Sequence, residues 1–198
     1  MRSTFPVIQL ARHGETAWAL SGRHTGLTDI PLTERGEAGA RLLGKRLQQG
    51  TYKAVLTSPL QRAKKTCELA GFGDVAVVDP DLVEWNYGDY EGLIGDQIRQ
   101  IQPGWNVFVN GCPNGESVAD VTARADRVVA RLRAVGDDVL VFSSGHFLRA
   151  LTARWCGLDV SFGRFLLLGT ATLSLLGYDH GTEEPVVRLW NDGHHLGD

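Results

Sequence analysis

The chain has 198 residues, 43% of them hydrophobic, and a formal net charge of −3. This length and composition predict one domain with a substantial buried core. No apolar run is long enough to cross a membrane, and the first residues lack the pattern of a secretion signal, so we expect a cytoplasmic protein. The acidic balance and the lack of basic runs argue against nucleic acid as a partner. The three cysteines show no metal-type spacing, which agrees with a reducing compartment.

Apolar segments with β character alternate with helical patterns along the chain. Strands are expected near residues 6–11, 52–57, 75–78, 138–143, 172–178 and 186–190. Helical patterns begin after Thr33 and after Ser117, two residues suited to cap a helix, and a third runs from Phe147 to Trp155. This alternation predicts a largely parallel sheet covered by helices on both faces. The last two strands, joined near His180, are expected to form an antiparallel hairpin at the sheet edge.

Residues 85–117 differ in composition from the rest of the chain. They are rich in Gly, Trp, Asn and Pro, with one short helical pattern near Leu93–Ile101. Long loops in compact domains usually carry function, so we expect this excursion to form the rim or lid of a site. No repeat or linker divides the chain, and residues 1–198 are therefore predicted to form a single domain that includes the excursion.

Polar residues follow the predicted strands at the points where the strands end. Arg12 and His13 come directly after the first strand, and Arg62 lies in the first turn of the helix after the second. The strand near 138–143 leads into Ser144 and a further helix. Ligands of open α/β sheets bind at the carboxyl edge of the strands. We therefore expect these residues to lie around one site.

The chemistry of these residue types suits a phosphate ester. An arginine guanidinium offers a planar cationic fork to phosphate oxygens, and the helix N-terminus at Arg62 favours an anion. The segment Glu84–Gly92 places carboxylates beside aromatic residues, surroundings suited to a proton donor. On chemistry alone, Glu84, Asp89 and Glu91 all remain candidates for that donor.

Taken together, these segments resemble the histidine phosphatase superfamily, the phosphoglycerate mutase-like group. The resemblance covers nearly the whole chain and rests on these segments: Arg12–Thr16, His24–Gly26, Asp29–Thr33, Ser58–Pro59 with Arg62–Ala63, Glu84–Gly92, Gly115–Ser117 and Gly145–Arg149. It implies an α/β fold of the three-layer α/β/α sandwich type with a mostly parallel central sheet.

The resemblance also implies a mechanism and a set of site residues. His13 would attack a phosphoryl group and form a phosphohistidine, Arg12 and Arg62 would hold the phosphoryl oxygens, and Glu84 would protonate the leaving oxygen. The chemistry needs no metal or other cofactor, because arginines and histidines supply the positive charge. The expected substrate-binding residues are Thr16, His24, Thr25, Gly26, Gly145 and His146.

One position departs from the pattern of the family. Members carry a second catalytic histidine directly before the glycine that corresponds to Gly145, and here that position is Ser144. A serine can donate one hydrogen bond to a phosphoryl oxygen but brings no positive charge. Three explanations stay open: an introduced inactivating substitution, a natural change for which His146 or a water compensates, and a protein that binds phosphate without turnover.

The leading hypothesis is a phosphomonoesterase that acts on a small phosphorylated metabolite such as a sugar phosphate. The first alternative is a phosphoglycerate mutase, and the second is a phosphate-binding pseudoenzyme. Ala19 follows Trp18 where mutases typically have Asn, and the chain is shorter than a typical mutase, so both features favour the phosphatase. The sequence does not identify the ester, and it leaves a homodimer open.

Overall fold

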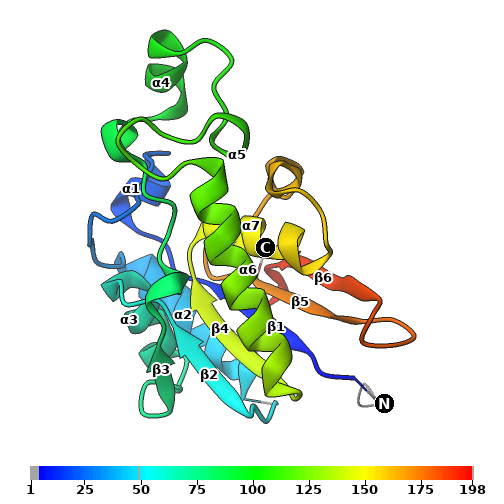
Figure 1. The fold of residues 1–198 in the computed structure, drawn as a ribbon. Helices are drawn as coiled ribbons and strands as arrows, with labels where there is room; N and C mark the ends of the chain where they lie inside the picture. Colours follow the sequence, from blue (N-terminus) through cyan, green and yellow to red (C-terminus); the bar gives the residue numbers. More distant parts are fainter. Residues whose placement is uncertain (1–4, 49, 198) are drawn as a thin grey trace.

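A six-stranded sheet forms the centre of the computed structural model, which describes residues 5–48 and 50–197 (Figure 1). The strands lie in the order β3-β2-β4-β1-β5-β6. Their bounds are β1 Ile8–Arg12, β2 Ala54–Thr57, β3 Ala76–Val78, β4 Val139–Ser143, β5 Leu173–Tyr178 and β6 Pro185–Asp192. The first four pair in parallel, whereas β5 is antiparallel to β1 and to β6. The predicted mostly parallel sheet and its edge hairpin are confirmed.

The parallel strands end together at one edge of the sheet. Arg12 at the end of β1 lies opposite Ser143 at the end of β4. Thr57, at the end of β2, lies opposite Phe142, the residue of β4 before Ser143. The chain then continues into the segments that carry His13 and Ser144, which brings two distant parts of the sequence to the same edge.

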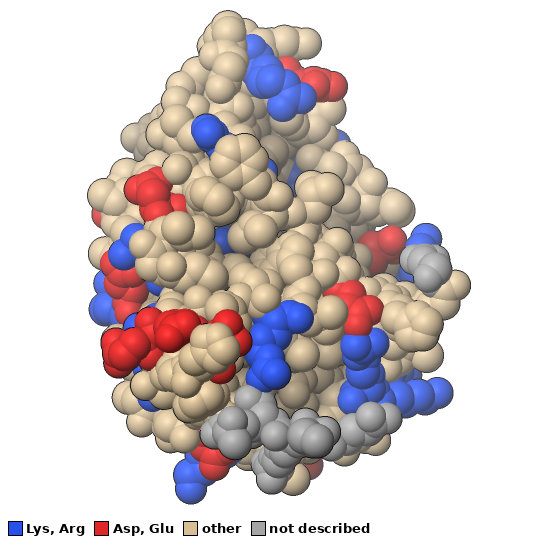
Figure 2. Space-filling view, turned by 90° about the vertical axis from the view of Figure 1, so that its right-hand side faces the viewer, with Lys and Arg blue, Asp and Glu red and all other residues tan. Residues whose placement is uncertain are grey.

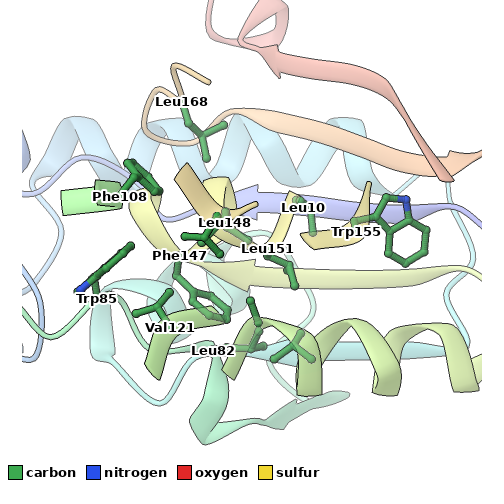
Figure 3. Packing of buried hydrophobic residues seen from close by; sticks show 14 of the residues in the cluster. Leu10, Leu82, Trp85, Phe108, Val121, Phe147, Leu148, Leu151, Trp155 and Leu168 are labelled. Atoms are coloured by element: carbon green, nitrogen blue, oxygen red, sulfur yellow. The ribbon is translucent and has the colours of Figure 1, made fainter. Parts of the chain in front are cut away.

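Helices cover both faces of the sheet, so the expected three-layer α/β/α sandwich is confirmed (Figure 1). α2 and α3 pack on one face, and α6 and α7 pack on the other. Alternate side chains of β4 serve the two cores, with Val141 in one and Phe142 in the other, so the strand is buried on both sides. Figure 3 shows the core on the side of α6 and α7. The helix bounds are α1 Ala17–Leu20, α2 Glu34–Leu47, α3 Gln61–Leu69, α4 Gly95–Ile101, α5 Val107–Asn110, α6 Val118–Val135 and α7 Gly145–Trp155.

The helices begin where the sequence provides capping residues. The Thr33 hydroxyl accepts a hydrogen bond from Gly36 N at 3.0 Å at the start of α2. At the start of α6, Ser117 and Asp120 form a capping box, in which each side chain bonds to the backbone N–H of the other residue. α7 begins at Gly145, two residues before the expected start.

The excursion over residues 85–117 contains more helix than the sequence suggests. In addition to α4, it forms the short helix α5, which the side chain of Asn106 caps at Phe108 N. No sequence pattern predicts α5, because its four residues, mostly apolar, are too few to show a helical period. Trp85 and Phe108 are fully buried and pack edge to face, which anchors the excursion to the core of the sandwich.

Charged side chains do not form one large basic surface on the face drawn in Figure 2, where acidic and basic groups lie in separate small clusters among the described residues. Within residues 5–48 and 50–197, no helix is long and apolar enough to cross a membrane.

Candidate active site

A pocket of about 190 Å³ opens at the edge of the sheet where β1 and β4 end. Its wall includes residues from β1, the loop after α1, the excursion and the start of α7. Eight of the residues expected at the site line it: Arg12, His13, Thr16, His24, Thr25, Glu84, Gly145 and His146. Distant parts of the sequence that carry the motifs therefore share one cavity.

His13 is buried at the base of this pocket and held in one tautomer. Its Nδ1 donates a hydrogen bond of 2.7 Å to the carbonyl oxygen of Gly14, so the hydrogen is on Nδ1 and the lone pair is on Nε2. Burial, together with the positive charges of Arg12 and Arg62, holds the pKa of His13 well below its usual value. The imidazole is therefore neutral near pH 7, the state in which Nε2 is a nucleophile.

Arg12 provides positive charge beside His13. Its Nη1 donates to the carbonyl oxygen of Leu168, and its Nε is buried without a hydrogen-bond partner. The guanidinium packs directly beneath the start of α7, where a Cβ on Gly145 would lie 3.1 Å from Arg12 Cζ. Burial lowers the pKa of Arg12 from its usual value. A buried donor without a partner is costly, and a bound anion would supply the missing acceptor.

Arg62 is turned toward the loop that covers the site. Its two terminal nitrogens donate to the carbonyl oxygens of Thr25, Gly26 and Thr28 at 2.8–3.0 Å. Its Nε, like that of Arg12, is buried without a partner. Arg62 therefore fixes the loop at the pocket, and of its five N–H groups the one on Nε and one on Nη1 remain for another acceptor.

Glu91 binds the backbone N–H groups of the same loop. One carboxylate oxygen of Glu91 accepts from Gly26 N at 2.8 Å and from Thr28 N at 3.3 Å. Gly26 is needed here, because a Cβ would lie 2.5 Å from the carbonyl oxygen of Trp85. Glu91 thus has a structural task and, within the described chain, forms no part of the pocket wall.

Glu84 closes the N-terminus of α7. Its Oε1 accepts from Trp85 N at 2.9 Å and from Phe147 N at 2.7 Å, and its Oε2 accepts from His146 N at 2.9 Å. The last two donors belong to the first turn of α7, where N–H groups have no partner within the helix. Glu84 therefore caps α7, and the three hydrogen bonds fix its carboxylate in the pocket wall.

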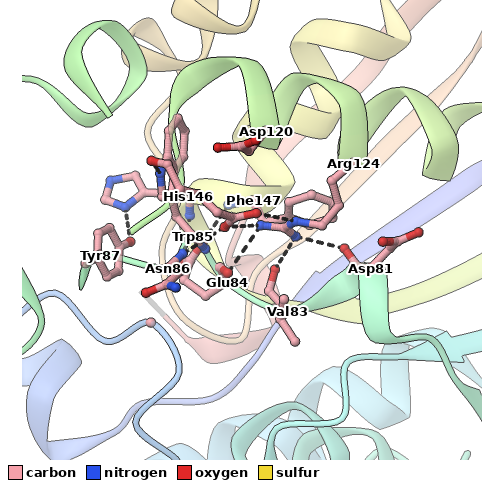
Figure 4. A network of polar contacts seen from close by, with 12 residues as sticks. Asp81, Val83, Glu84, Trp85, Asn86, Tyr87, Asp120, Arg124, His146 and Phe147 are labelled. Carbon is pink, nitrogen blue, oxygen red and sulfur yellow. Dashed lines mark hydrogen bonds and ion pairs between the residues drawn. The ribbon is translucent and has the colours of Figure 1, made fainter. Parts of the chain in front are cut away.

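An ion pair between the buried Arg124 and the half-buried Glu116 supports the backbone that carries Glu84 (Figure 4). Arg124 of α6 donates to the carboxylate of Glu116 at 2.7 and 2.8 Å. The same guanidinium donates to the carbonyl oxygens of Asp81, Val83 and Glu84 at 2.8–3.3 Å. A side chain that bonds to three carbonyls of one segment determines where that segment lies.

Ser144 occupies the N-cap position of α7 but does not cap it. Its hydroxyl has no hydrogen-bond partner and is fully buried. The carboxylate of Glu84 takes the N–H groups that a serine cap would normally bind. The hydroxyl thus keeps its hydrogen-bonding capacity unused.

His146 and His24 stand side by side on another part of the wall. Their rings stack with centroids 5.8 Å apart. Burial and nearby positive charges hold the pKa of His146 well below its usual value, and burial raises the pKa of Tyr87 well above its own. The Tyr87 hydroxyl therefore keeps its hydrogen, and we assign the hydroxyl as the donor in its hydrogen bond with Nδ1 of His146 (Figure 4). We assign the remaining ring hydrogen of His146 to Nε2.

The family follows from comparison with known proteins. Residues 8–193 match the histidine phosphatase superfamily (branch 1). The chain belongs to this superfamily.

Relatives and solved structures agree with that assignment. An acid phosphatase of Mycobacterium tuberculosis is 43% identical, with 90% of this chain and 89% of the relative covered. A sedoheptulose 1,7-bisphosphatase of Saccharomyces cerevisiae is 35% identical, with 81% and 71% covered. The crystal structure of an open reading frame product of M. tuberculosis superimposes with a TM-score of 0.90 at 41% identity, over 96% and 99% of the two chains. Proteins named as phosphoglycerate mutases also match.

This histidine phosphatase brings most, but not all, of the expected residues into the pocket wall. Within the described chain, Arg62, Gly26 and Ser144 are not among the residues that line the pocket. Of the three candidate proton donors only Glu84 lines it, since Glu91 binds the loop and Asp89 is exposed and accepts from Asn114. The assignment of roles to these residues stays a prediction.

Several residues of the site are not among the site residues predicted from the sequence, although Tyr87 was a candidate for either the mouth of the site or the packing of the excursion. Tyr87 and Arg149 line the pocket, and Arg124 with Glu116 supports Glu84. Arg124 carried a signal, because it interrupts the apolar stripe of α6 between Val121 and Val128. A buried charge on such a stripe usually has a partner.

One group of side chains that could bind a metal ion lies away from the pocket in the described part of the chain. Asp179, His180 and Glu184 lie close enough together to hold an ion, but all three are exposed. They occupy the turn between β5 and β6, and because β5 is antiparallel to β1 this turn lies at the sheet edge opposite His13.

Proposed function

We propose that this histidine phosphatase is a metal-independent phosphomonoesterase that hydrolyses small phosphate esters through a phosphohistidine at His13. The observation that carries the proposal is the state of His13, a neutral imidazole whose hydrogen is held on Nδ1 by Gly14 and whose Nε2 is free. The adjacent Arg12, with a buried Nε that lacks a partner, offers charge and a hydrogen bond to the phosphoryl group.

The first step transfers the phosphoryl group to His13. A bond forms from Nε2 to phosphorus as the bond from phosphorus to the ester oxygen breaks, and the leaving oxygen takes a proton from Glu84. Positive charge that develops on the imidazole is relieved by the hydrogen bond from Nδ1 to Gly14. Arg12 and the Nε of Arg62 meet the charge on the phosphoryl oxygens.

The second step releases phosphate. Water attacks phosphorus and gives a proton to Glu84 as the bond from phosphorus to Nε2 breaks. His13 and Glu84 then return to their starting states. Fixed donors and acceptors serve both steps without rearrangement, which is how phosphoryl transfer is mainly accelerated.

Ser144 limits the expected rate. A serine hydroxyl supplies one hydrogen bond in a place where a histidine could supply charge as well, and loss of one preorganised donor costs about 10²–10³ in rate. The unpartnered hydroxyl of Ser144 supports a contact to a phosphoryl oxygen. The same substitution supports the alternative that the protein binds a phosphorylated ligand without turnover.

A panel of phosphate esters tests the proposal. Release of inorganic phosphate from p-nitrophenyl phosphate and from sugar phosphates is measured with excess EDTA present. We expect hydrolysis that the chelator does not change. Activity that requires added metal, or transfer of phosphate between positions of phosphoglycerate without its release, would contradict the proposal. Binding of esters with no hydrolysis would favour the pseudoenzyme.

A further inference from the structure

The loop that leads into β5, residues 167–172, contacts both residues to which we assign the central steps of phosphoryl transfer. The carbonyl oxygen of Leu168 accepts a hydrogen bond from Nη1 of Arg12. The backbone N–H of Ala171 donates to the carbonyl oxygen of His13 at 3.0 Å. This β5 loop therefore helps to determine where the Arg12 guanidinium lies and where the main chain at His13 lies.

Three side chains from the segment 190–196, which includes the end of β6, bind the backbone of the β5 loop. The three hydrogen bonds, at 2.5–2.8 Å, join Trp190 Nε1 to the carbonyl oxygen of Leu167, Asn191 Oδ1 to the N–H of Gly169, and His195 Nε2 to the carbonyl oxygen of Ala171. They fall on alternate residues of the loop. An irregular loop has no strand partner for its backbone groups, so these side chains supply the partners and fix the path of the loop.

The contact between the β5 loop and this segment includes two residues in the left-handed backbone region. Ala171 has a φ of 55° and Asn191 a φ of 56°, values that residues other than glycine adopt rarely. A backbone of this kind persists where the surrounding contacts impose it. Ala171 donates to His13 from this conformation, and Asn191 brings its amide oxygen to Gly169 from its own. The contact therefore constrains the loop at the point where it meets His13.

His195 acts as a donor to the loop. Its partner at Nε2 is a carbonyl oxygen, so the ring hydrogen is on Nε2, and Nδ1 is buried without a hydrogen-bond partner. Burial lowers the pKa of His195, which keeps the ring neutral near pH 7. The hydrogen bond to Ala171 is thus maintained by one tautomer under the conditions of an assay.

We propose that Asn191 and His195 are positioning residues for phosphoryl transfer, which act through the β5 loop on Arg12 and His13. The inference rests on the proposed function of His13. Neither Asn191 nor His195 lines the pocket in the described chain, so their effect on the reaction passes through the loop. A displacement of about 1 Å in the reacting groups can lower a rate by about 10², so loss of these contacts should be seen in kcat.

Variants of Asn191 that remove or keep the acceptor test the proposal. Asn191→Gly removes the side-chain oxygen and tolerates a positive φ, whereas Asn191→Asp keeps an oxygen that can accept from Gly169. We expect Asn191→Gly to lower kcat for p-nitrophenyl phosphate about tenfold, and its combination with His195→Phe to lower kcat by up to about 100-fold. Circular dichroism at the assay temperature shows that the protein compared is folded. Asn191→Asp should recover part of the lost kcat.

Arg46→Met is the matched control. Arg46 of α2 pairs with Asp192, so this variant removes a contact of the same segment that, in the described chain, goes to α2 and not to the β5 loop. It should lower the melting temperature but change kcat by less than about twofold at a temperature where the protein is folded, because the partners of Arg12 and His13 stay in place. A role in stability alone predicts this behaviour for the Asn191 variants as well.

A measurement that does not need turnover separates this inference from the proposed function. The ring ¹⁵N signals of His13, assigned by their loss in His13→Asn, should shift or broaden in Asn191→Gly and stay in place in Arg46→Met. If the protein hydrolyses no ester, this comparison decides the question.

Four results would overturn the positioning role. They are His13 signals that do not change in Asn191→Gly, a kcat that does not change in the double variant, no difference between Asn191→Gly and Asn191→Asp, and an equal loss of kcat in Arg46→Met. If the double variant does not fold, the single variants of Asn191 give the answer with a smaller effect.

Discussion

Two ends of the pocket are built in different ways. The end that we assign to the phosphoryl group consists of residues at or after the ends of parallel strands: Arg12 and His13 in the pocket wall, and the buried Arg62 and Ser144, which are not part of that wall. The outer wall consists of residues from the loop after α1, the excursion and α7: His24, Tyr87, His146 and Arg149. Strand ends bring the first group together through the sheet itself, whereas the second depends on how loops pack.

The two ends also differ in how their polar groups are satisfied. Three of the described buried side-chain atoms without a partner belong to the phosphoryl end, on Arg12, Arg62 and Ser144. In the outer wall, Tyr87 and His146 bond to each other, and His24 donates to the carbonyl oxygen of Leu93 at 2.9 Å. The phosphoryl end is therefore prepared for an anion, and most of the outer wall is prepared to keep its shape. The predictions below separate these roles.

The largest effect is expected from Glu84→Gln. General acid catalysis contributes about 10²–10⁴ in rate, and its loss matters most when the leaving oxygen is a poor leaving group. Turnover of an alkyl phosphate should fall by that factor, and turnover of p-nitrophenyl phosphate should fall far less. The matched control is Asp89→Asn, which changes an exposed carboxylate outside the described pocket wall. Equal losses on both esters would remove Glu84 from the role of proton donor.

Ser144→His should have the next largest effect, in the opposite direction. A histidine would add a preorganised donor at the phosphoryl group, so hydrolysis should rise by about 10²–10³. Binding of inorganic phosphate should change much less, because the added group acts mainly on the transition state. Ser144→Asn serves as a control for size without charge. If Ser144→His brings no gain and His146→Ala abolishes activity, His146 has taken over the role.

A smaller effect is expected from Tyr87→Phe, which removes the donor that fixes the tautomer of His146. One hydrogen bond of this kind corresponds to roughly a tenfold change at most, seen in kcat/KM. The loss should vanish when His146 is already alanine, which a double-mutant cycle measures. Tyr90→Phe is the matched control, because its hydroxyl bonds to Gln102 outside the described pocket wall. An equal loss in the His146→Ala background would show that Tyr87 acts independently of His146.

The smallest effect concerns pH and stability. The pKa of His13 is lowered in the folded protein by burial first and by Arg12 and Arg62 next, so the unfolded chain binds the proton more readily. This histidine therefore weakens folding as the pH falls below about 6.5, by at most about 1.4 kcal/mol per pH unit. Urea titrations between pH 7.5 and 5 should show a smaller decline for His13→Asn than for the unmodified protein. Identical declines would show that the pKa of His13 is not lowered.

The difference between the two ends explains what the sequence could predict. The ends of β1 and β4 were recognisable from apolar runs that stop at Arg12 and at Ser143, and the parallel sheet brings such ends together. The position of Arg149 near Gly145 could have been predicted from the helical spacing. The orientation of its guanidinium could not, because it depends on tertiary contacts with Phe108 and Gly163.

The rest of the site depends on contacts that no local pattern encodes. The direction of Tyr87 follows from the packing of the excursion, and the short helix α5 within it has no visible period. The capping of α7 by Glu84, in place of Ser144, joins residues about sixty positions apart. Contacts between residues so far apart in the sequence can be identified only when the three-dimensional fold is known.

The most direct test of the account is detection of phosphate on His13. The protein is mixed with a ³²P-labelled ester, quenched in alkali, and digested for mass spectrometry. The account predicts an acid-labile, alkali-stable label on the peptide that contains His13, formed and lost at rates consistent with turnover, and no label in His13→Asn. Acid-stable label on a serine, or turnover that persists in His13→Asn, would contradict it.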